Sequence, residues 1–421
     1  MLTPVVELDG SIRSIRGASV ACEADSDVTR PDAFRVLVTA DYFEPGYRAG
    51  GPVRSLSSML DTVGPGIDTT LVTRDRDLGA SRPYLGLSGR WVRRGRCSVF
   101  YLGARNPRQW RDLWRGVRAR RFDLLYVNSV WSSYSIVSVL AARLGVLRVD
   151  RILVAPRGEL GAGALALRRN RKRLFLLGWR RLLGGSRVFW HATTPLEAAD
   201  IRRVFPAAGQ PFIAGATGPA ADDPPAAPAS TGPARLVFIG RVSPMKNLDL
   251  VLAALSRVRG PVEFDVYGPI EDTGYWQRCL ALMEALPGDV RATYRGALRP
   301  EAVRDTFSRY DAFVLPTRGE NFGHVIAESL SVACPVICSD RTPWSEVLEA
   351  GGGAVLPELT VDALATKIED IVGGSAQQRH AARVAAGAAY RDWRERTAAR
   401  VGVLDVARTA FRVRQEASAA R

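Results

Sequence analysis

The sequence has 421 residues, of which 47% are hydrophobic, and a formal net charge of +15 at pH 7. This length accommodates two domains with sizeable cores. No uninterrupted apolar run approaches the about 18 residues of a membrane-spanning helix, so we expect none. The five cysteines are scattered and predict no disulfide framework.

Strand and helix patterns alternate along the chain from the first predicted strand, residues 34–39. This alternation predicts parallel sheets with helices on both faces. We expect a polar N-terminal extension over 1–33, compatible with disorder, an N-terminal domain over 34–205 and a C-terminal domain over 235–375. A Pro/Ala/Gly-rich linker over 206–234 joins the domains, and helices follow over 376–421. The extension lacks the apolar core of a signal peptide, which favours a cytoplasmic protein.

The charge excess lies in one part of the chain. Residues 101–187 contain 18 Arg and one Lys against four acidic residues, which accounts for the entire excess. Two stretches here predict basic helices, 108–121 and 168–187. Such helices suit either an anionic membrane surface or packing of their apolar faces on a sheet. For the second helix we expect the apolar face to pack inside the domain, with its basic residues lining an acceptor cleft. Contact of either helix with an anionic membrane is kept as an alternative.

Polar residues follow two predicted strands of the N-terminal domain. The strand 124–127 leads to Asn128, and Arg157 and Glu159 follow the next strand in the segment APRGEL. Because ligands bind at the carboxyl ends of parallel strands, we expect these side chains to face a cleft and to contact a sugar or an acceptor.

Two cations follow the first predicted strand of the C-terminal domain. The apolar run 236–239 leads to Gly240, then to Arg241 and Lys246, and a helical pattern follows. Two cations on such a loop can neutralise a diphosphate. The chain has only three Lys among 58 basic residues, so a retained Lys suggests a need for a compact point charge. The alternative is a solvated loop with two stray charges.

Two carboxylates eight residues apart are the most informative feature. In RGENFGHVIAESL, Glu320 lies in a loop after the predicted strand 312–315, and Glu328 lies in the helix that follows. Gly323 allows a ligand close to the backbone, and the free N–H groups of the helix's first turn suit a phosphate. The acids could then bind hydroxyl groups on either side of it, as in a sugar nucleotide. Alternatively, Glu320 only caps a helix and Glu328 is solvated.

These motifs together resemble the family 4 glycosyltransferases, which have the GT-B fold. FIGRVSPMKNLDLVLAAL and RGENFGHVIAESL are similar to the family's C-terminal half, and AGGPVRSL (49–56), APRGELGAGAL (155–165) and HATTPLEAADIRR (191–203) extend the resemblance upstream. The resemblance implies two Rossmann-like, doubly wound parallel-sheet domains that face a central cleft. It also implies C-terminal helices that cross back to the N-terminal domain, for which Tyr390 and Trp393 are candidate anchors.

The resemblance implies retaining transfer from a nucleoside-diphosphate sugar to a saccharide or lipid-diphosphate-linked acceptor, in bacterial surface-polysaccharide synthesis. Arg241, Lys246 and Glu320 would be catalytic: the two cations would stabilise charge on the leaving diphosphate, and Glu320 would hold the sugar. Glu328 would bind the ribose. The implied donor-binding residues lie in glycine-containing loops or early in helices: Gly50, Gly51, Gly240, Asn321, Phe322, Gly323, His324 and Glu328.

Family members are usually described as metal-independent, so we expect no metal and no cofactor besides the donor. Asp75 and Asp77 have the Asp-x-Asp spacing of metal-dependent transferases, but they match loop residues of the resembled family that have no metal role. The chain departs from the family at one position: many members have a His after the fourth strand of the N-terminal domain, near the reacting centre, whereas this chain has Asn128, so no imidazole acts there. The alternatives are a basic nucleic-acid- or membrane-binding protein with a degenerate site, or an epimerase on the same fold. We expect no nucleic-acid partner, because Glu320 and Glu328 would then be unexplained.

Overall fold

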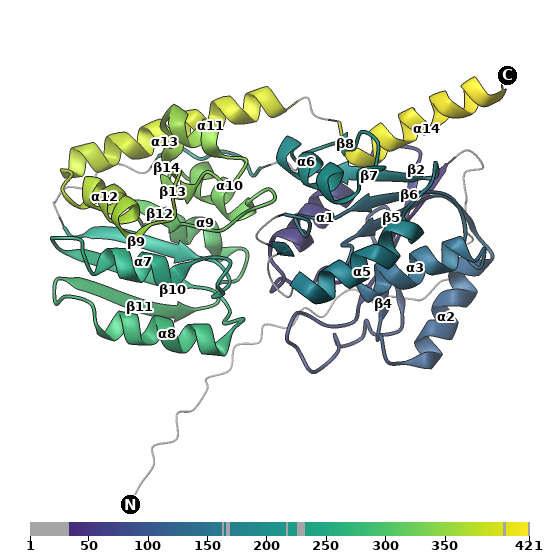
Figure 1. Ribbon diagram of the computed structural model, residues 1–421, viewed down its shortest axis with the longest axis horizontal. Helices are drawn as coiled ribbons and strands as arrows, with labels where there is room; N and C mark the ends of the chain where they lie inside the picture. Colours follow the sequence, from purple (N-terminus) through teal and green to yellow (C-terminus); the bar gives the residue numbers. More distant parts are fainter. Residues whose placement is uncertain are drawn as a thin grey trace, which may run out of the picture.

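The computed structural model describes residues 33–161, 164–165, 169–215, 218–224, 232–398 and 401–419. Apart from residue 33, the expected N-terminal extension lies outside these residues, as does part of the expected linker. Within the described residues the chain forms two sheets, each flanked by helices on both faces (Figure 1). The prediction of two doubly wound, largely parallel domains is confirmed.

The N-terminal sheet has the strand order β3-β4-β2-β1-β5-β6-β7-β8. Only β3, which pairs with β4, is antiparallel. The strands are β1 Phe34–Thr39, β2 Ile67–Arg74, β3 Trp91–Arg94, β4 Cys97–Leu102, β5 Arg121–Asn128, β6 Arg148–Ala155, β7 Val188–Ala192 and β8 Phe212–Ile213. The helices are α1 Gly51–Asp61, α2 Pro107–Arg118, α3 Ser133–Arg143, α5 Arg169–Leu182 and α6 Pro195–Val204.

The C-terminal sheet is parallel throughout, in the order β11-β10-β9-β12-β13-β14. Its strands are β9 Ala234–Ile239, β10 Val262–Tyr267, β11 Val290–Gly296, β12 Ala312–Leu315, β13 Val336–Ser339 and β14 Gly353–Leu356. The helices are α7 Leu248–Leu255, α8 Thr273–Glu284, α9 Ala302–Phe307, α10 His324–Ser331, α11 Ser345–Val347, the π-helical turn η1 Leu348–Gly352, and α12 Val361–Val372.

Burial explains why these segments form central strands. β12 and β13 are buried along their whole lengths, as expected for strands covered on both faces. In each sheet the strand order reverses beside the first strand of the domain, at β1/β5 and at β9/β12. Ligands of open parallel sheets bind at the carboxyl ends of strands at such a switch point. The fold therefore predicts one ligand-binding edge in each domain.

The basic helices are shorter than the sequence predicted. The first ends at Arg118 rather than at residue 121, because β5 begins at Arg121. The second spans Arg169–Leu182, and Gly185 in the turn after it has a positive φ of 105°. No helix among the described residues is long and apolar enough to cross a membrane.

The last two helices lie on different domains. α13 (Ala376–Thr397) packs on the C-terminal domain, and α14 (Val403–Ala419) lies against β8 of the N-terminal domain (Figure 1). Tyr390 and Trp393 do not anchor the crossing to the N-terminal domain as expected. Both rings pack against Trp344 of the C-terminal domain, with centroid distances of 6.3 and 4.6 Å. The anchor on the N-terminal domain is Phe411.

We expect Phe411→Ala to destabilise the N-terminal domain by about 3–5 kcal/mol, as is usual for a buried Phe. The Phe411 ring is 1% exposed, packs 4.7 Å from the Phe189 ring, and lies 4.7 Å from the Arg151 guanidinium carbon. Urea denaturation measures the loss. The control, Val401→Ala, removes a side chain that is 59% exposed and should change stability by less than about 0.5 kcal/mol. Equal effects of the two substitutions would contradict this packing role.

Candidate active site

A cleft of about 890 Å³ lies between the two domains. Its walls are loops and first helical turns that follow the carboxyl ends of strands. These are the sheet edges at which the strand order predicts ligand binding. The structure brings thirteen of the predicted site residues to this cleft: Gly50, Gly51, Arg157, Glu159, Gly240, Arg241, Lys246, Glu320, Asn321, Phe322, Gly323, His324 and Glu328. Asn128 is the one predicted site residue that does not line it.

The loop after β12 carries Glu320, and helix α10, which follows it, carries Glu328. The side chains of Glu320 and Glu328 are 12% and 13% exposed and line the cleft. Gly323, at the N-cap of α10, has φ 78° and ψ 56°. A Cβ atom there would lie 3.1 Å from Ile326 Cδ1, so both conformation and space favour glycine. The backbone N–H of Glu320 donates to Arg341 O at 3.1 Å, which fixes the loop to the segment after β13.

The two predicted cations occupy different environments. Lys246 Nζ forms an ion pair with Glu320 Oε1, and both side chains are largely buried. Arg241 instead pairs with Glu271 at 2.9 Å, where both side chains are more than a third exposed. Lys246 is therefore the cation held in the cleft, and Arg241 lies at its rim. Sequence reasoning gave Lys246 and Glu320 separate roles, whereas the structure joins them directly.

The glycine loop of the N-terminal domain is held by Asp77. The side chain of Asp77 accepts hydrogen bonds from the backbone N–H groups of Tyr47 and Arg48, at 3.0 and 3.2 Å. Asp75 accepts from Ser88 Oγ at 2.7 Å and from Arg76 Nε at 2.9 Å. Asp77 thus positions the loop that leads to Gly50, and Asp75 holds Ser88 and Arg76. Among the described residues no group of three or more His, Cys, Asp or Glu could hold a metal ion.

Asn128 acts on Arg157 rather than on the cleft itself. Asn128 is 7% exposed, and its Oδ1 accepts from Arg157 Nη2 at 2.7 Å and from Arg157 Nε at 3.0 Å. Arg157 Nη2 also donates to Tyr126 Oη at 2.9 Å. Arg157 has a positive φ of 56° and lines the cleft. The amide and the phenol therefore hold this guanidinium in one orientation at the cleft.

The first histidine of the chain lies behind Arg157. His191 Nε2 lies 2.9 Å from Ala214 O, which can only accept, so Nε2 carries the proton. Nδ1 then accepts from the hydroxyl of Tyr126 at 2.7 Å. Burial, helped by the charge of Arg157, lowers the pKa of His191 to about 3. The imidazole is neutral, and it orients Tyr126 so that its oxygen accepts from Arg157.

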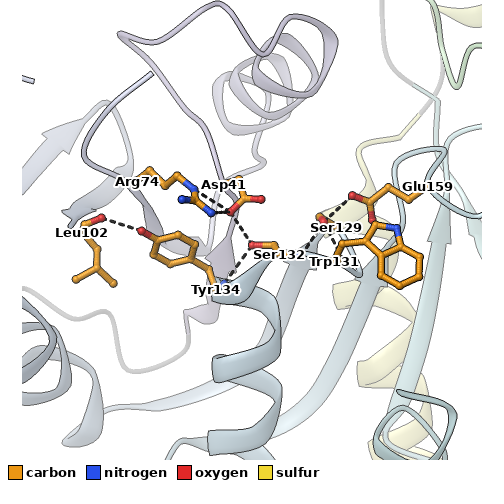
Figure 2. Close-up of polar contacts among 8 residues, drawn as sticks. All are labelled: Asp41, Arg74, Leu102, Ser129, Trp131, Ser132, Tyr134 and Glu159. Atoms are coloured by element: carbon orange, nitrogen blue, oxygen red, sulfur yellow. Dashed lines mark hydrogen bonds and ion pairs between the residues drawn. The ribbon is translucent and has the colours of Figure 1, made fainter. Parts of the chain in front are cut away.

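Glu159 lines the cleft and ties neighbouring strand ends together (Figure 2). Its two oxygens accept from Ser129 Oγ at 2.6 Å and from the backbone N–H of Val130 at 2.7 Å. Ser129 has a positive φ of 96°, a conformation that a non-glycine residue adopts only when its surroundings fix it. Glu159 supplies that constraint. Burial raises the pKa of Glu159 to about 7.

A second carboxylate joins the ends of β1, β2 and β5, as Figure 2 shows. Asp41, just after β1, accepts from Arg74 Nη2 at 3.1 Å and from Ser132 Oγ at 2.9 Å. Arg74 ends β2, and Ser132 caps α3 after β5. The ligand-facing edge of the N-terminal sheet is therefore held by carboxylates on both sides of Ser129.

Sequence reasoning missed Glu197 and Thr193. Glu197 is 4% exposed and accepts from Gly158 N, Thr193 N and Thr193 Oγ1 at 2.7, 2.8 and 2.9 Å. Thr193 Oγ1 also lies 2.9 Å from the side-chain amide of Asn321, in the other domain. The signal in the sequence was the capping pattern of Thr194 and Glu197, where Glu197 N donates to Thr194 Oγ1 at 3.1 Å. That pattern marks a helix start but not a contact between domains.

Comparisons with known proteins match this chain to glycosyltransferases. Residues 220–387 match the family model described as Glycosyl transferases group 1. The O-antigen chain mannosyltransferase B of Escherichia coli is 30% identical over 138 residues, 31% of this chain and 35% of the relative. A D-inositol 3-phosphate glycosyltransferase of Rhodococcus erythropolis is 30% identical over 112 residues, 25% of either chain. The chain thus matches about a third and a quarter of the length of these relatives.

Solved structures share the fold over nearly the whole chain. Sucrose-phosphate synthase from Thermosynechococcus elongatus superposes with a TM-score of 0.67 and 18% identity, covering 92% of this chain and all of that one. HepE of Anabaena, solved in complex with UDP and glucose, gives a TM-score of 0.62 and 14% identity, covering 91% of this chain and all of that one. The two-domain fold is therefore that of GT-B glycosyltransferase structures, as predicted, and residues 220–387 carry a glycosyl transferases group 1 domain.

We expect Glu159→Gln to have a larger free energy of unfolding than the wild type. The difference should grow as pH rises from about 5 to about 8, up to about 3 kcal/mol. The folded-state pKa of Glu159 is raised from 4.5 to about 7. Stability from the protonated group is therefore full below pH 4.5 and is lost as pH rises through about 7. Gln cannot ionise, and its amide can still donate to Ser129 Oγ.

Urea denaturation of both proteins across this pH range measures the difference. The control, Glu349→Gln, alters an exposed carboxylate and should follow the wild type at each pH. If the wild type and Glu159→Gln show the same pH dependence, the carboxyl of Glu159 does not titrate as described.

Proposed function

We propose that this protein is a retaining glycosyltransferase of the family 4 type, which transfers a sugar from a nucleoside-diphosphate sugar to a saccharide or lipid-diphosphate-linked acceptor. The observation that carries the proposal is one cleft that holds the Lys246–Glu320 pair, Glu328 and the glycine loop of the opposite domain. The match of residues 220–387 to the Glycosyl transferases group 1 model supports it.

The chemistry follows from where the charges lie. Cleavage of the bond between the sugar and the diphosphate leaves negative charge on the leaving group, and Lys246 and Arg241 can stabilise it. Lys246 is already oriented by Glu320 and lies in a largely buried place, where a fixed cation acts more strongly than in water. The N–H groups of Asn321–His324 reach the same phosphates, while Glu320 holds the sugar and Glu328 the ribose. A fixed cation then does what a metal ion does in other transferases.

The acceptor side of the proposal rests on Arg157 and Glu159. Arg157 presents a fixed guanidinium to the cleft from the N-terminal domain, opposite the donor loops. A guanidinium in a fixed orientation suits an anionic or hydroxylated acceptor. The partial match to an O-antigen chain mannosyltransferase supports a role in bacterial surface-polysaccharide synthesis.

We also propose that the N-terminal domain rests on the inner face of the cytoplasmic membrane. The apolar stripe of α2 packs inward, since Leu113 and Val117 are buried, so the exposed face of α2 is charged and consists of its arginines and Asp112. α5 buries Trp179 but exposes Leu174 and Leu177, at 75% and 63%. α3 packs beside α5 (Figure 1), and Leu144, which caps the C-terminus of α3, is 77% exposed. Neither helix contains an acidic residue, so this surface combines leucines with cations, as an anionic bilayer requires.

We expect Lys246→Ala and Glu320→Gln each to lower turnover by at least about 10²-fold, the scale of one lost transition-state contact. Thermal stabilisation of the protein by UDP, GDP, ADP and TDP sugars first selects the donor. Turnover is then measured as release of nucleoside diphosphate from that donor. Lys367→Ala is the matched control, because Lys367 is an exposed lysine of the same domain. Near-normal turnover in either site variant would refute the assignment, and conversion of the donor sugar without any acceptor would indicate an epimerase.

We expect Leu174→Glu/Leu177→Glu to lower binding to phosphatidylglycerol vesicles by at least about tenfold, because burial of a leucine side chain contributes about 1.5–3 kcal/mol. Vesicle flotation measures this, with neutral phosphatidylcholine vesicles for comparison. Leu85→Glu is the control, since Leu85 is fully exposed on a different loop. Unchanged flotation of the double variant would exclude this surface as the membrane contact.

A further inference from the structure

Helix α1 of the N-terminal domain meets helix α10 of the C-terminal domain at the cleft. Ser55 Oγ lies 2.5 Å from His324 Nε2, and a Cβ atom on Gly51 would lie 3.4 Å from His324 Cδ2. One turn further along α10, Arg54 Nη1 forms an ion pair with Glu328 Oε1. Both of these charged side chains line the cleft, and they are 30% and 13% exposed.

In the Arg54–Glu328 pair, a cation of the N-terminal domain contacts a carboxylate of the C-terminal domain. This carboxylate is the one to which we assign ribose binding. A carboxylate has two oxygens and about four acceptor positions, so a guanidinium on Oε1 leaves acceptor positions for two neighbouring hydroxyl groups. A guanidinium also fixes the direction in which a carboxylate points, because its N–H groups lie in one plane. The pair is largely screened from solvent, and an ion pair in such a place is stronger than one on an open surface.

We propose that Arg54 is a positioning residue that orients Glu328 toward the ribose of the nucleotide, so that the N-terminal domain completes the nucleoside subsite of the C-terminal domain. This inference rests on the proposed function, because it takes Glu328 as the ribose ligand. Different residues then recognise the two parts of the donor. Recognition of the nucleoside depends on Arg54, whereas recognition of the diphosphate depends on Lys246 and Arg241.

The test compares nucleoside diphosphates with inorganic pyrophosphate, which has no ribose. Isothermal titration calorimetry with UDP, GDP, ADP and TDP first selects the one that the wild type binds most tightly. We expect Arg54→Ala and Glu328→Gln each to weaken its binding by about tenfold, and the double variant to be no weaker than either single variant. Binding of pyrophosphate should change by less than about twofold in all three, because the cations that hold the phosphates are untouched.

Two further variants separate positioning from a general structural effect. Arg54→Lys keeps a cation without the planar fork, so it should recover part of the affinity lost in Arg54→Ala. Arg202→Ala, which removes an exposed arginine of the same domain, should leave both ligands unaffected. In turnover, Arg54→Ala should raise KM for the donor and leave kcat nearly unchanged.

The outcomes distinguish the inference from the function on which it rests. Wild-type affinity of Arg54→Ala for the nucleoside diphosphate, or an equal loss for pyrophosphate, would overturn the role of Arg54 alone. Additive losses in the double variant would also overturn it, because they would show that Arg54 and Glu328 act independently. If the wild type binds none of the four nucleoside diphosphates, the proposed function and the inference both fail.

Discussion

The parallel direction of the strands is the constraint on which the site depends. In a parallel sheet all strands end at the same edge, so the loops after β1, β5 and β6 gather on one side of the N-terminal domain, and those after β9 and β12 gather in the C-terminal domain. The cleft between the two edges receives residues that are far apart in the sequence, such as Gly51 and His324. The side chains of the site act from loops and from the helices α1 and α10, while the buried strands hold these segments in place.

Buried carboxylates then fix the loops that the strands bring together. Glu159, Glu197 and Asp77 each accept hydrogen bonds from backbone N–H groups of loops that reach the cleft. A buried N–H group without a partner is costly, so each of these contacts determines one loop conformation. The raised pKa of Glu159 reflects the burial that this arrangement requires. These acids hold loops through backbone N–H groups, whereas Glu320 and Glu328 pair with the cations Lys246 and Arg54.

The sequence predicted the fold and thirteen of the residues that line the cleft, because the relevant signals are local. The buried run of β12 and the glycine before α10 can be recognised within a few residues, and the spacing of Glu320 and Glu328 lies within one strand–loop–helix unit. Contacts across the fold gave no such signal. The pairing of Arg54 with Glu328 joins residues 274 positions apart, and Asn128 proved to hold Arg157 because β5 and β6 are neighbours. Periodicity places a residue on an element, but only the packing of the elements determines its partner.

The chain passes between the domains twice, once between β8 and β9 and once between α13 and α14. Near the C-terminal domain the two passages are joined, because the hydroxyl of Tyr390 on α13 donates to Pro219 O at 2.9 Å. A single connection would let the domains turn about any axis, whereas two connections favour rotation about the line that joins them. Any opening of the cleft would therefore follow this one axis and keep the donor loops of one domain opposite the same residues of the other.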